Sequence, residues 1–397
     1  MKAWILNDIN NICFTDTDIP LPSENEVLIQ VKTVGICGSD IPRIYGTGAH
    51  NMPLIPGHEF SGIVEGVGKN ADPSLLKKRV AVFPKITYPS SDSYNNYDYL
   101  GSRRNGAFAE YVTVPADNIL LLPDDVTFEE AAMMEPLAVA ANAVRTGTKS
   151  VSCDSPIAVC GLGTIGLMVV MLLIEAGYNN IYAIGNKDSQ KNNAFSLGIA
   201  PHCFIDSRNE NVSEQLNLVS KGVSVFFECV GKNECIAHGI ESASLNGHLV
   251  LIGNPYSDML FSKDTYWQIL RKQLTVHGIW NSFFSKDYSK DCLDDWHYSL
   301  ALVAQKKIPL NKLISHRFNP SELEKALHIC LIENMYRHIF VLQIHNVCII
   351  INRICHFNCI INFSSNIRKS PRNRTLSRTI LSIHQAQRRN FIAHHLK

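Results

Sequence analysis

The sequence predicts an α/β protein of two domains, one rich in short strands and one built on a doubly wound parallel sheet. Its 397 residues suit two domains better than one. Short strands separated by Gly, Pro and Asn turns fill residues 1–147, whereas strands alternate with helices over residues 148–280. Apolar residues make up 46% and charged residues 18% of the chain, a balance that excludes disordered, collagen-like and coiled-coil proteins.

The first part is expected to be mostly β-structure. Its clearest strand segments alternate or run apolar at strand length, and they are residues 27–35, 62–68, 78–84 and 109–115. A helix is expected over residues 127–143, because Glu129 and Glu130 fall in its first turn, where the helix dipole favours acidic side chains.

The second part is expected to form the parallel sheet. Its strand segments are residues 157–161, 180–185, 223–231, 248–253 and 274–280. Residues 167–177 between the first two are helix-like and end at a glycine. Strands that alternate with helices imply a parallel sheet with helices on both faces. Residues 281–343 add two helical stretches, around residues 292–305 and 320–333, and a final strand.

A GxGxxG motif follows the first of these strands and opens the first helix. Its glycines are Gly161, Gly163 and Gly166, with Thr164 and Ile165 between the last two. The first glycine allows the tight turn, the second lets the backbone approach a pyrophosphate, and the third lets the helix pack on the strand. The unpaired N–H groups of the helix N-terminus then face the phosphates. The motif in this position predicts a dinucleotide-binding domain.

The position that reads the ribose of a dinucleotide carries no acid. The second strand ends at Gly185, where a carboxylate is expected, and Asp188 lies three residues further on. The missing acid removes a repulsion toward the 2′-phosphate of NADP, and Lys187 is placed to attract that phosphate. We predict NAD as the cofactor and keep NADP as the alternative.

Two separated segments carry side chains that bind zinc. Cys37 lies in the first segment, and His58 and Glu59 follow about 20 residues later. A catalytic zinc needs three protein ligands and one open position. The third ligand is either Glu59 or the distant Glu135, and the sequence does not separate the two.

Four motifs together give the chain a family resemblance. They are Cys37-Gly38-Ser39-Asp40, Gly57-His58-Glu59, Glu135-Pro136-Leu137 and the glycines from Gly161 to Gly166. From residue 1 to about residue 342, the chain resembles the zinc-dependent medium-chain alcohol and polyol dehydrogenases. The resemblance implies a GroES-like catalytic domain at residues 1–147, a Rossmann domain at residues 148–280, and a return to the catalytic domain at residues 281–343.

The resemblance also implies roles around the metal. Cys37 and His58 match zinc ligands, while Glu59 and Glu135 match a ligand or a carboxylate beside it. Asp40 matches the residue that orients the zinc-bound histidine, as such histidines usually require.

Proton transfer and assembly are implied in the same way. Ser39 matches the hydroxyl that takes the alcohol proton, and His50 or water would pass this proton outward. Pairing of residues 274–280 across a two-fold axis implies a homodimer or homotetramer.

The substrate prediction rests on longer segments. Residues 37–50, 97–111 and 270–282 most resemble the family members that act on sugar-alcohol phosphates. We predict oxidation of a secondary hydroxyl of such a phosphate to the ketose phosphate, with hydride transfer to NAD or NADP. Arg43, Arg103 and Arg104 are hypothesised to bind the phosphate, because guanidinium offers paired donors. The alternatives are a dehydrogenase of free polyols or other secondary alcohols, and a degenerate, non-catalytic nucleotide-binding relative.

One departure from the family concerns metal content. Many relatives carry four cysteines around a structural zinc in a lobe that corresponds to residues 85–96. Here no cysteine occurs between Cys37 and Cys153. We therefore predict a single, catalytic zinc per subunit and no structural zinc.

A second departure is the C-terminal segment, residues 344–397. It carries nine Lys or Arg and no Asp or Glu, so the first 343 residues hold 28 basic against 36 acidic side chains. We predict a basic tail outside the fold, and its group of Cys348, Cys355, His356 and Cys359 is a weak metal-site candidate.

Charge, apolar runs and cysteine pattern limit the kinds of partner and the cellular compartment that we expect. The mildly acidic body argues against nucleic acid as a partner. The polar N-terminus and the short apolar runs indicate neither a secretion signal nor a membrane span. The twelve cysteines are scattered singly, so we expect them reduced and the protein cytoplasmic.

Overall fold

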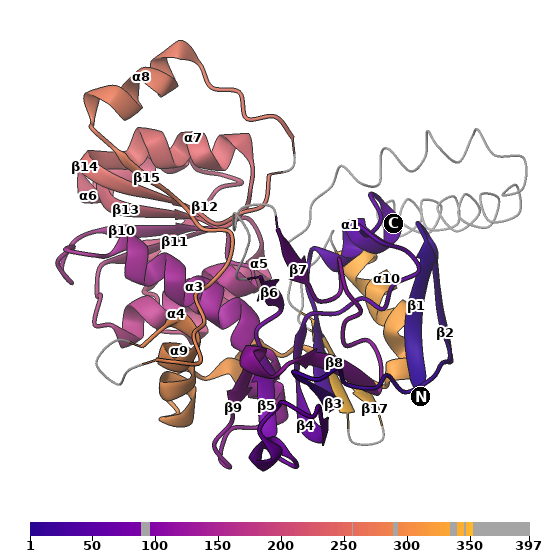
Figure 1. The fold of residues 1–397 in the computed structure, drawn as a ribbon. Helices are drawn as coiled ribbons and strands as arrows, with labels where there is room; N and C mark the ends of the chain where they lie inside the picture. Colours follow the sequence, from indigo (N-terminus) through magenta and orange to yellow (C-terminus); the bar gives the residue numbers. More distant parts are fainter. Residues whose placement is uncertain (89–95, 256, 289–292, 334–339, 345–346, 352–397) are drawn as a thin grey trace, which may run out of the picture. The chain divides into compact units, whose positions relative to one another are not determined.

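The computed structural model describes residues 1–88, 96–255, 257–288, 293–333, 340–344 and 347–351. All elements given below belong to the unit Met1–Cys355. They form two large sheets with the helices packed against them (Figure 1). In the described part of the chain, no helix is long and apolar enough to cross a membrane.

The second part of the chain forms a six-stranded, all-parallel sheet in the order β12-β11-β10-β13-β14-β15. The strands are β10 (Ile157–Cys160), β11 (Ile181–Gly185), β12 (Phe204–Asp206), β13 (Val223–Glu228), β14 (Ala243–Leu251) and β15 (Thr275–Gly278). This order, read as 3-2-1-4-5-6, is that of the Rossmann fold. The predicted doubly wound parallel sheet is confirmed.

Helices cover both faces of this sheet. They are α4 (Thr164–Glu175), α5 (Asp188–Ser196), α6 (Val212–Ser220), α7 (Asn233–Ser242) and α8 (Lys263–Arg271). Successive strand residues face opposite sides, so Phe227 packs in the core that includes α4, whereas Phe226 packs in the core of α6 and α7. Figure 1 shows α6 and α7 on one face of the sheet and α4 on the other.

The first part of the chain contributes most of an eight-stranded, mixed sheet in the order β16-β17-β18-β3-β4-β5-β9, with β8 also paired to β3. These strands are β3 (Glu26–Ile36), β4 (Glu59–Val67), β5 (Arg79–Val82), β8 (Tyr111–Pro115), β9 (Ile119–Leu121), β16 (His316–Phe318), β17 (Phe340–Ile344) and β18 (Val347–Ile351). Two hairpins flank it: β1 (Lys2–Asp8) with β2 (Asn11–Asp16), and β6 (Lys85–Thr87) with β7 (Tyr97–Tyr99). Residues 316–318 and 340–344 also belong to this sheet.

The predicted end of the fold at residue 343 needs a correction. Val347–Ile351, assigned above to the tail, forms β18, which pairs antiparallel with β17 and parallel with β3. The segment reads Val-Cys-Ile-Ile-Ile, and β-branched residues favour strands. Cys355, His356 and Cys359 lie outside the described residues, as does the rest of the predicted tail.

The predicted helix over residues 127–143 is two helices, α2 (Phe128–Ala132) and α3 (Met134–Gly147). Thr127 caps α2 in a capping box with Glu130. Pro136 has no N–H to donate to the carbonyl of Ala132, and its ring crowds that carbonyl, so one continuous helix is disfavoured. A new helix therefore begins just before Glu135 and carries this residue in its first turn.

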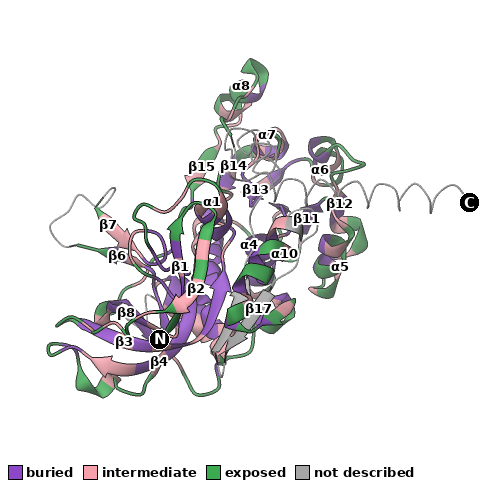
Figure 2. Ribbon diagram, turned by 90° about the vertical axis from the view of Figure 1, so that its right-hand side faces the viewer, coloured by how far each residue is buried: buried purple, intermediate pink, exposed green. Residues whose placement is uncertain are grey.

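The remaining helices connect the sheets. They are α1 (Asp40–Tyr45), α9 (Asp295–Ala304) and α10 (Leu323–Glu333), with short 3₁₀ turns at Pro73–Leu75, Ala116–Asn118, Pro201–Cys203, Leu310–Leu313 and Pro320–Glu322. Helix α3 packs in one core with α4 and α9. Helix α4 is largely buried, whereas helix α8 is mostly exposed (Figure 2).

Candidate active site

A cavity of about 240 Å³ lies where the two sheets meet. Its wall includes Cys37 and Ser39 after β3, His58 before β4, Glu135 at the start of α3, and Thr164 at the start of α4. The cavity thus joins the predicted zinc-binding segments to the predicted dinucleotide loop.

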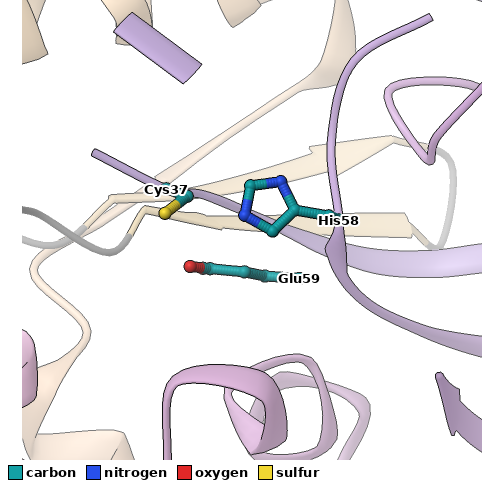
Figure 3. A group of neighbouring side chains, drawn as sticks. All are labelled: Cys37, His58 and Glu59. Atoms are coloured by element: carbon teal, nitrogen blue, oxygen red, sulfur yellow. The ribbon is translucent and has the colours of Figure 1, made fainter. Parts of the chain in front are cut away.

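Three candidate zinc ligands lie together in this cavity. The sulfur of Cys37, a ring nitrogen of His58 and a carboxylate oxygen of Glu59 all lie within 4.8 Å of one another. Figure 3 shows the three side chains turned toward a common space. Thiolate, imidazole and carboxylate are the donors that bind zinc in catalytic sites.

The surroundings of His58 fit a bound cation. His58 is 3% exposed, and its Nδ1 lies 3.6 Å from the carboxylate of Asp40, while its other ring nitrogen faces Cys37 (Figure 3). Burial lowers the pKa of His58 to about 3, with a smaller effect of the Arg43 charge, so the imidazole is neutral and keeps a lone pair for a metal.

The surroundings of Cys37 lead to the same conclusion. Burial raises the pKa of this thiol well above its usual range, and the carboxylates of Glu59 and Asp40 raise it further. A divalent cation between these groups would offset the repulsion and favour the thiolate. The residues present therefore fit a zinc ion.

Asp40 lies behind the ligand group, where the resemblance puts the residue that orients His58. It is fully buried in the first turn of α1, and its Oδ2 accepts the N–H of Cys37 at 3.0 Å. Its Oδ1 forms an ion pair with Arg43 and lies 3.6 Å from Nδ1 of His58. Burial raises the pKa of Asp40 to about 6, against the opposing charge of Arg43.

Glu135 lies on the cavity wall but outside the three-residue group. Its Oε1 accepts a 2.9 Å hydrogen bond from the hydroxyl of Tyr99. Burial raises the pKa of Glu135 to about 7, and the Tyr99 hydrogen bond opposes the rise. Glu59 therefore lies within the candidate ligand group, whereas Glu135 lines the cavity wall beside it.

The glycine motif has the predicted geometry. Gly161 has φ = +93°, in the left-handed region that favours glycine, and a Cβ on Gly166 would lie 2.0 Å from the carbonyl oxygen of Gly161. Gly163 is the N-cap of α4 and gives the helix no side-chain cap, and a helix N-terminus in this position favours the binding of a phosphate. Thr164 and Ile165 line the cavity.

Comparison with known proteins agrees with both halves of this site. Residues 23–124 match the alcohol dehydrogenase GroES-like domain, and residues 164–295 match the zinc-binding dehydrogenase domain. Galactitol 1-phosphate 5-dehydrogenase of Escherichia coli (strain K12) is 31% identical over 331 residues, which cover 80% of this chain and 92% of that protein. The chain belongs to the zinc-dependent medium-chain dehydrogenase family. This membership supports an oxidoreductase and confirms the GroES-like and Rossmann assignment.

Other family members resemble the chain to a similar degree. D-xylulose reductase of Saccharomyces cerevisiae is 30% identical over 82% of this chain and 92% of that protein. Among solved structures, galactitol-1-phosphate dehydrogenase from Escherichia coli has a TM-score of 0.77 at 26% identity and covers 89% of this chain and 100% of its own. The structure of 2R,3R-butanediol dehydrogenase from Bacillus subtilis has a TM-score of 0.74 at 26% identity, covering 89% of this chain and 99% of its own.

The predicted proton path of this medium-chain dehydrogenase starts in the cavity. Ser39 and His50 both line it, Ser39 just before α1 and His50 as an exposed residue. The N–H of His50 donates to the carbonyl of Ser102, another residue of the wall. The outer end of the predicted relay therefore reaches solvent.

The three predicted phosphate-binding arginines separate in the structure. Arg43 lines the cavity, whereas Arg103 lies over the ring of Tyr97, a residue of the wall, at 4.1 Å from its centroid. Arg104 forms an ion pair with the buried Glu26, and neither Arg103 nor Arg104 belongs to the wall. Phosphate binding by these arginines stays a prediction.

Sequence reasoning missed the aromatic part of the wall. Tyr97, Tyr99 and Trp280 line the cavity, with ring centroids of Trp280 at 5.5 Å from Tyr97 and 6.2 Å from Tyr99. Nothing in their local pattern separates them from core residues, and only the segment resemblance pointed to residues 97–111 and 270–282.

Two predicted features keep their status as predictions. Lys187 is the half-buried N-cap residue of α5, next to the end of β11, and no nucleotide is present to test its contact. The absence of a structural zinc concerns a lobe whose residues 89–95 lie outside the described part.

Proposed function

We propose that this protein oxidises a secondary hydroxyl of a sugar-alcohol phosphate, of the galactitol 1-phosphate type, to the ketose phosphate, with hydride transfer to NAD or NADP. One observation carries the proposal: the group of Cys37, His58 and Glu59 and the N-terminus of α4 line the same cavity. A substrate hydroxyl beside this group and the nicotinamide end of a dinucleotide could therefore meet there, aligned by the two sheets.

The residues of this chain have separate tasks in the proposed reaction. Cys37, His58 and Glu59 would hold one catalytic zinc, which as a Lewis acid lowers the pKa of the substrate hydroxyl. Ser39 takes the hydroxyl proton, and His50 or water passes it to solvent. Asp40 holds the orientation of His58.

The dinucleotide would be held by the glycine loop. The N–H groups at the start of α4 bind its pyrophosphate, and Thr164 and Ile165 bring this loop to the cavity wall. The bound nicotinamide supplies the hydride chemistry. The carbon to be oxidised would lie between the group of Cys37, His58 and Glu59 and the glycine loop, so the phosphate end of the substrate would point toward the remaining wall.

Two arginines support a phosphorylated substrate. Arg43 is 13% exposed and is held by Asp40, but guanidinium has five N–H donors, so further donors remain for a phosphate. Arg103 lies on the outer side of Tyr97 and donates to its carbonyl at 2.9 Å. The similarity to galactitol 1-phosphate 5-dehydrogenase supports the same substrate class.

The rival function is the oxidation of a free polyol or another secondary alcohol, and the resemblance to D-xylulose reductase and butanediol dehydrogenase favours it. The deciding experiment measures zinc content and then NAD and NADP reduction with matched pairs of polyol phosphate and free polyol. We expect one zinc per subunit and a kcat/KM at least tenfold higher for the phosphorylated member. Preference for the free polyols would establish the rival, and a zinc-free protein without activity would overturn both.

We also propose that two copies pair along β15. This strand is the edge of the parallel sheet, where Val276 is 47% exposed, and an exposed edge strand offers unpaired backbone groups to a second copy. The neighbouring α8 exposes Tyr266, Trp267 and Leu270. Light scattering should give the mass of a dimer or of a tetramer built from it, and Val276→Lys should lower that mass. A monomer at micromolar concentration would contradict the proposal.

A further inference from the structure

The carboxyl ends of β11 and β12 carry two basic side chains, Lys187 and Arg208, and two acidic ones, Asp188 and Asp206, beside the glycine loop. Gly185 and Asp206 are partners in the register of the two strands, and the N–H of Ser207 donates to the carbonyl of Gly185 at 2.9 Å. The N–H of Gly161 donates to the carbonyl of Ile184 at 3.0 Å. The segments after β11 and β12 therefore lie at the sheet edge where a dinucleotide that starts at the glycine loop places its adenosine ribose.

No carboxylate stands at the end of β11 to accept ribose hydroxyls. The position is Gly185, and the side chain of Gln190 fills the space beside it: a Cβ there would lie 3.0 Å from Oε1 of Gln190. Gln190 is 2% exposed, and its Oε1 accepts the N–H of Asn186 at 2.9 Å. The end of β11 thus carries no acid of the kind that selects NAD, and the side chain of Gln190 would have to shift to admit one at position 185.

Arg208 is held at this position by two carboxylates. Its Nε donates to both oxygens of Asp206, at 2.9 and 3.1 Å, and its Nη2 donates to Asp188 at 2.7 Å. Within the described part of the chain, Nη1 makes no hydrogen bond. The guanidinium is therefore fixed in place and keeps one edge for a further anion, while Lys187 stands next to Asp188.

The two acids do not turn the site into an NAD site. Asp206 binds Arg208 through both oxygens, so its lone pairs are largely used. Asp188 is 81% exposed in its side chain, and exposed ion pairs contribute at most about 1 kcal/mol. A 2′-phosphate, with nearly two negative charges, can replace Asp188 on the guanidinium at little cost.

We infer that the dinucleotide site takes NADP(H) in preference to NAD(H), with the 2′-phosphate bound by Lys187 and Arg208. The inference rests on the proposed function only in that the glycine loop must bind a dinucleotide. It reverses the preference for NAD predicted from the sequence, because Arg208, which no sequence motif singled out, joins Lys187 at the end of β11.

The test measures binding without turnover. The purified, zinc-loaded full chain is titrated by calorimetry with NADPH and NADH, and with 2′-phospho-ADP-ribose and ADP-ribose, which lack the nicotinamide. We expect at least tenfold tighter binding of the phosphorylated member of each pair. Rising ionic strength should weaken the binding of the phosphorylated nucleotide more steeply than that of its unphosphorylated partner, because salt screens the attraction between charges.

Substitutions of Lys187 and Arg208 test whether these residues bind the 2′-phosphate. Lys187→Ala and Arg208→Ala should each weaken NADPH binding at least fivefold and change NADH binding less than twofold. Lys263→Ala, which removes an exposed lysine of α8, is the charge-matched control and should change neither. Melting temperatures within 2 °C of the parent would show that folding is intact.

The outcomes separate this inference from the proposed function. NADH binding as tight as NADPH binding, or variants that weaken both equally, would overturn the inference and leave the dehydrogenase proposal standing. Failure of all four nucleotides to bind the folded protein would overturn both.

Discussion

The hydroxyl of Tyr99 donates a 2.9 Å hydrogen bond to Oε1 of Glu135, and this bond joins β7 to the start of α3 across the cavity wall. Tyr99 thereby holds Glu135 on the wall, outside the group formed by Cys37, His58 and Glu59. The ring of Tyr99 also lies edge-on to that of His58, with centroids 5.6 Å apart. Glu135 and Glu59, which the sequence left as equal candidates, therefore have different expected effects on metal content.

Substitution of the two glutamates should separate metal binding from turnover. Glu59→Gln removes the charge of the proposed third ligand, and we expect the zinc content to fall below about a fifth of the parent value. Glu135→Gln should keep zinc near one per subunit and lower kcat at least tenfold. Plasma emission spectrometry on dialysed protein gives the zinc content, with Cys37→Ser as the control for a lost ligand. Equal zinc loss in both glutamine variants would show that Glu135 is also a ligand.

Asp40 should control zinc affinity without touching the metal. Asp40→Asn removes the negative charge that lies 3.6 Å from Nδ1 of His58 and pairs with Arg43. Loss of such an orienting group typically weakens metal binding about 10–100-fold. Competition with a chromogenic chelator measures this affinity. Arg43→Lys keeps a cation beside Asp40 and is the matched control, expected to bind zinc within threefold of the parent.

Arg103 and Arg104 are adjacent in sequence but should differ in effect. Arg103→Ala should raise KM at least fivefold for a polyol phosphate and less than twofold for the matching free polyol. Arg104→Ala should change the KM of neither substrate. It should lower the free energy of unfolding by about 1–3 kcal/mol, because buried Glu26 loses its charged partner. Paired kinetics and urea denaturation measure both effects. The reverse pattern would assign phosphate binding to Arg104 and a structural role to Arg103.

Features that depend on the pattern of neighbouring residues could be predicted from the sequence. Strand and helix alternation predicted the parallel sheet, and the spacing of Gly161, Gly163 and Gly166 predicted the N-terminus of α4. Features that depend on distant contacts were out of reach. The ion pair of Arg104 with Glu26 joins residues 78 positions apart, and the choice between Glu59 and Glu135 depends on how α3 packs.

Two errors in the predicted elements have simple physical causes. The helix prediction over residues 127–143 followed acidic residues at its start and gave too little weight to Pro136, which separates α2 from α3. The fold boundary at residue 343 followed the end of the resemblance. Strand propensity in Val347–Ile351 was a usable signal for β18, but the basic composition further along obscured it.

Glu228 links two loops of the dinucleotide domain through a buried carboxyl group. It ends β13, is fully buried, and its Oε1 accepts the N–H groups of Val230 and Gly231 at 2.7 and 2.8 Å. Burial raises the pKa of Glu228 from 4.5 to about 7, and these hydrogen bonds oppose the rise. In the folded protein, the group therefore stays protonated at pH values where it is ionised in the unfolded chain.

This difference predicts how stability depends on pH. Between about pH 4.5 and pH 7, the folded state binds more protons than the unfolded state, so the contribution of Glu228 is complete below this window and falls as pH rises through it. The slope is at most about 1.4 kcal/mol per pH unit. Glu228→Gln does not titrate, so the stability advantage of the parent over this variant should shrink from pH 5 to pH 7.5. Urea denaturation of both zinc-loaded proteins across this range measures it, and Asp264→Asn, at an exposed carboxylate of α8, should leave the parent's pH profile unchanged. An advantage that is constant with pH would mean that Glu228 is already ionised in the folded protein at pH 5.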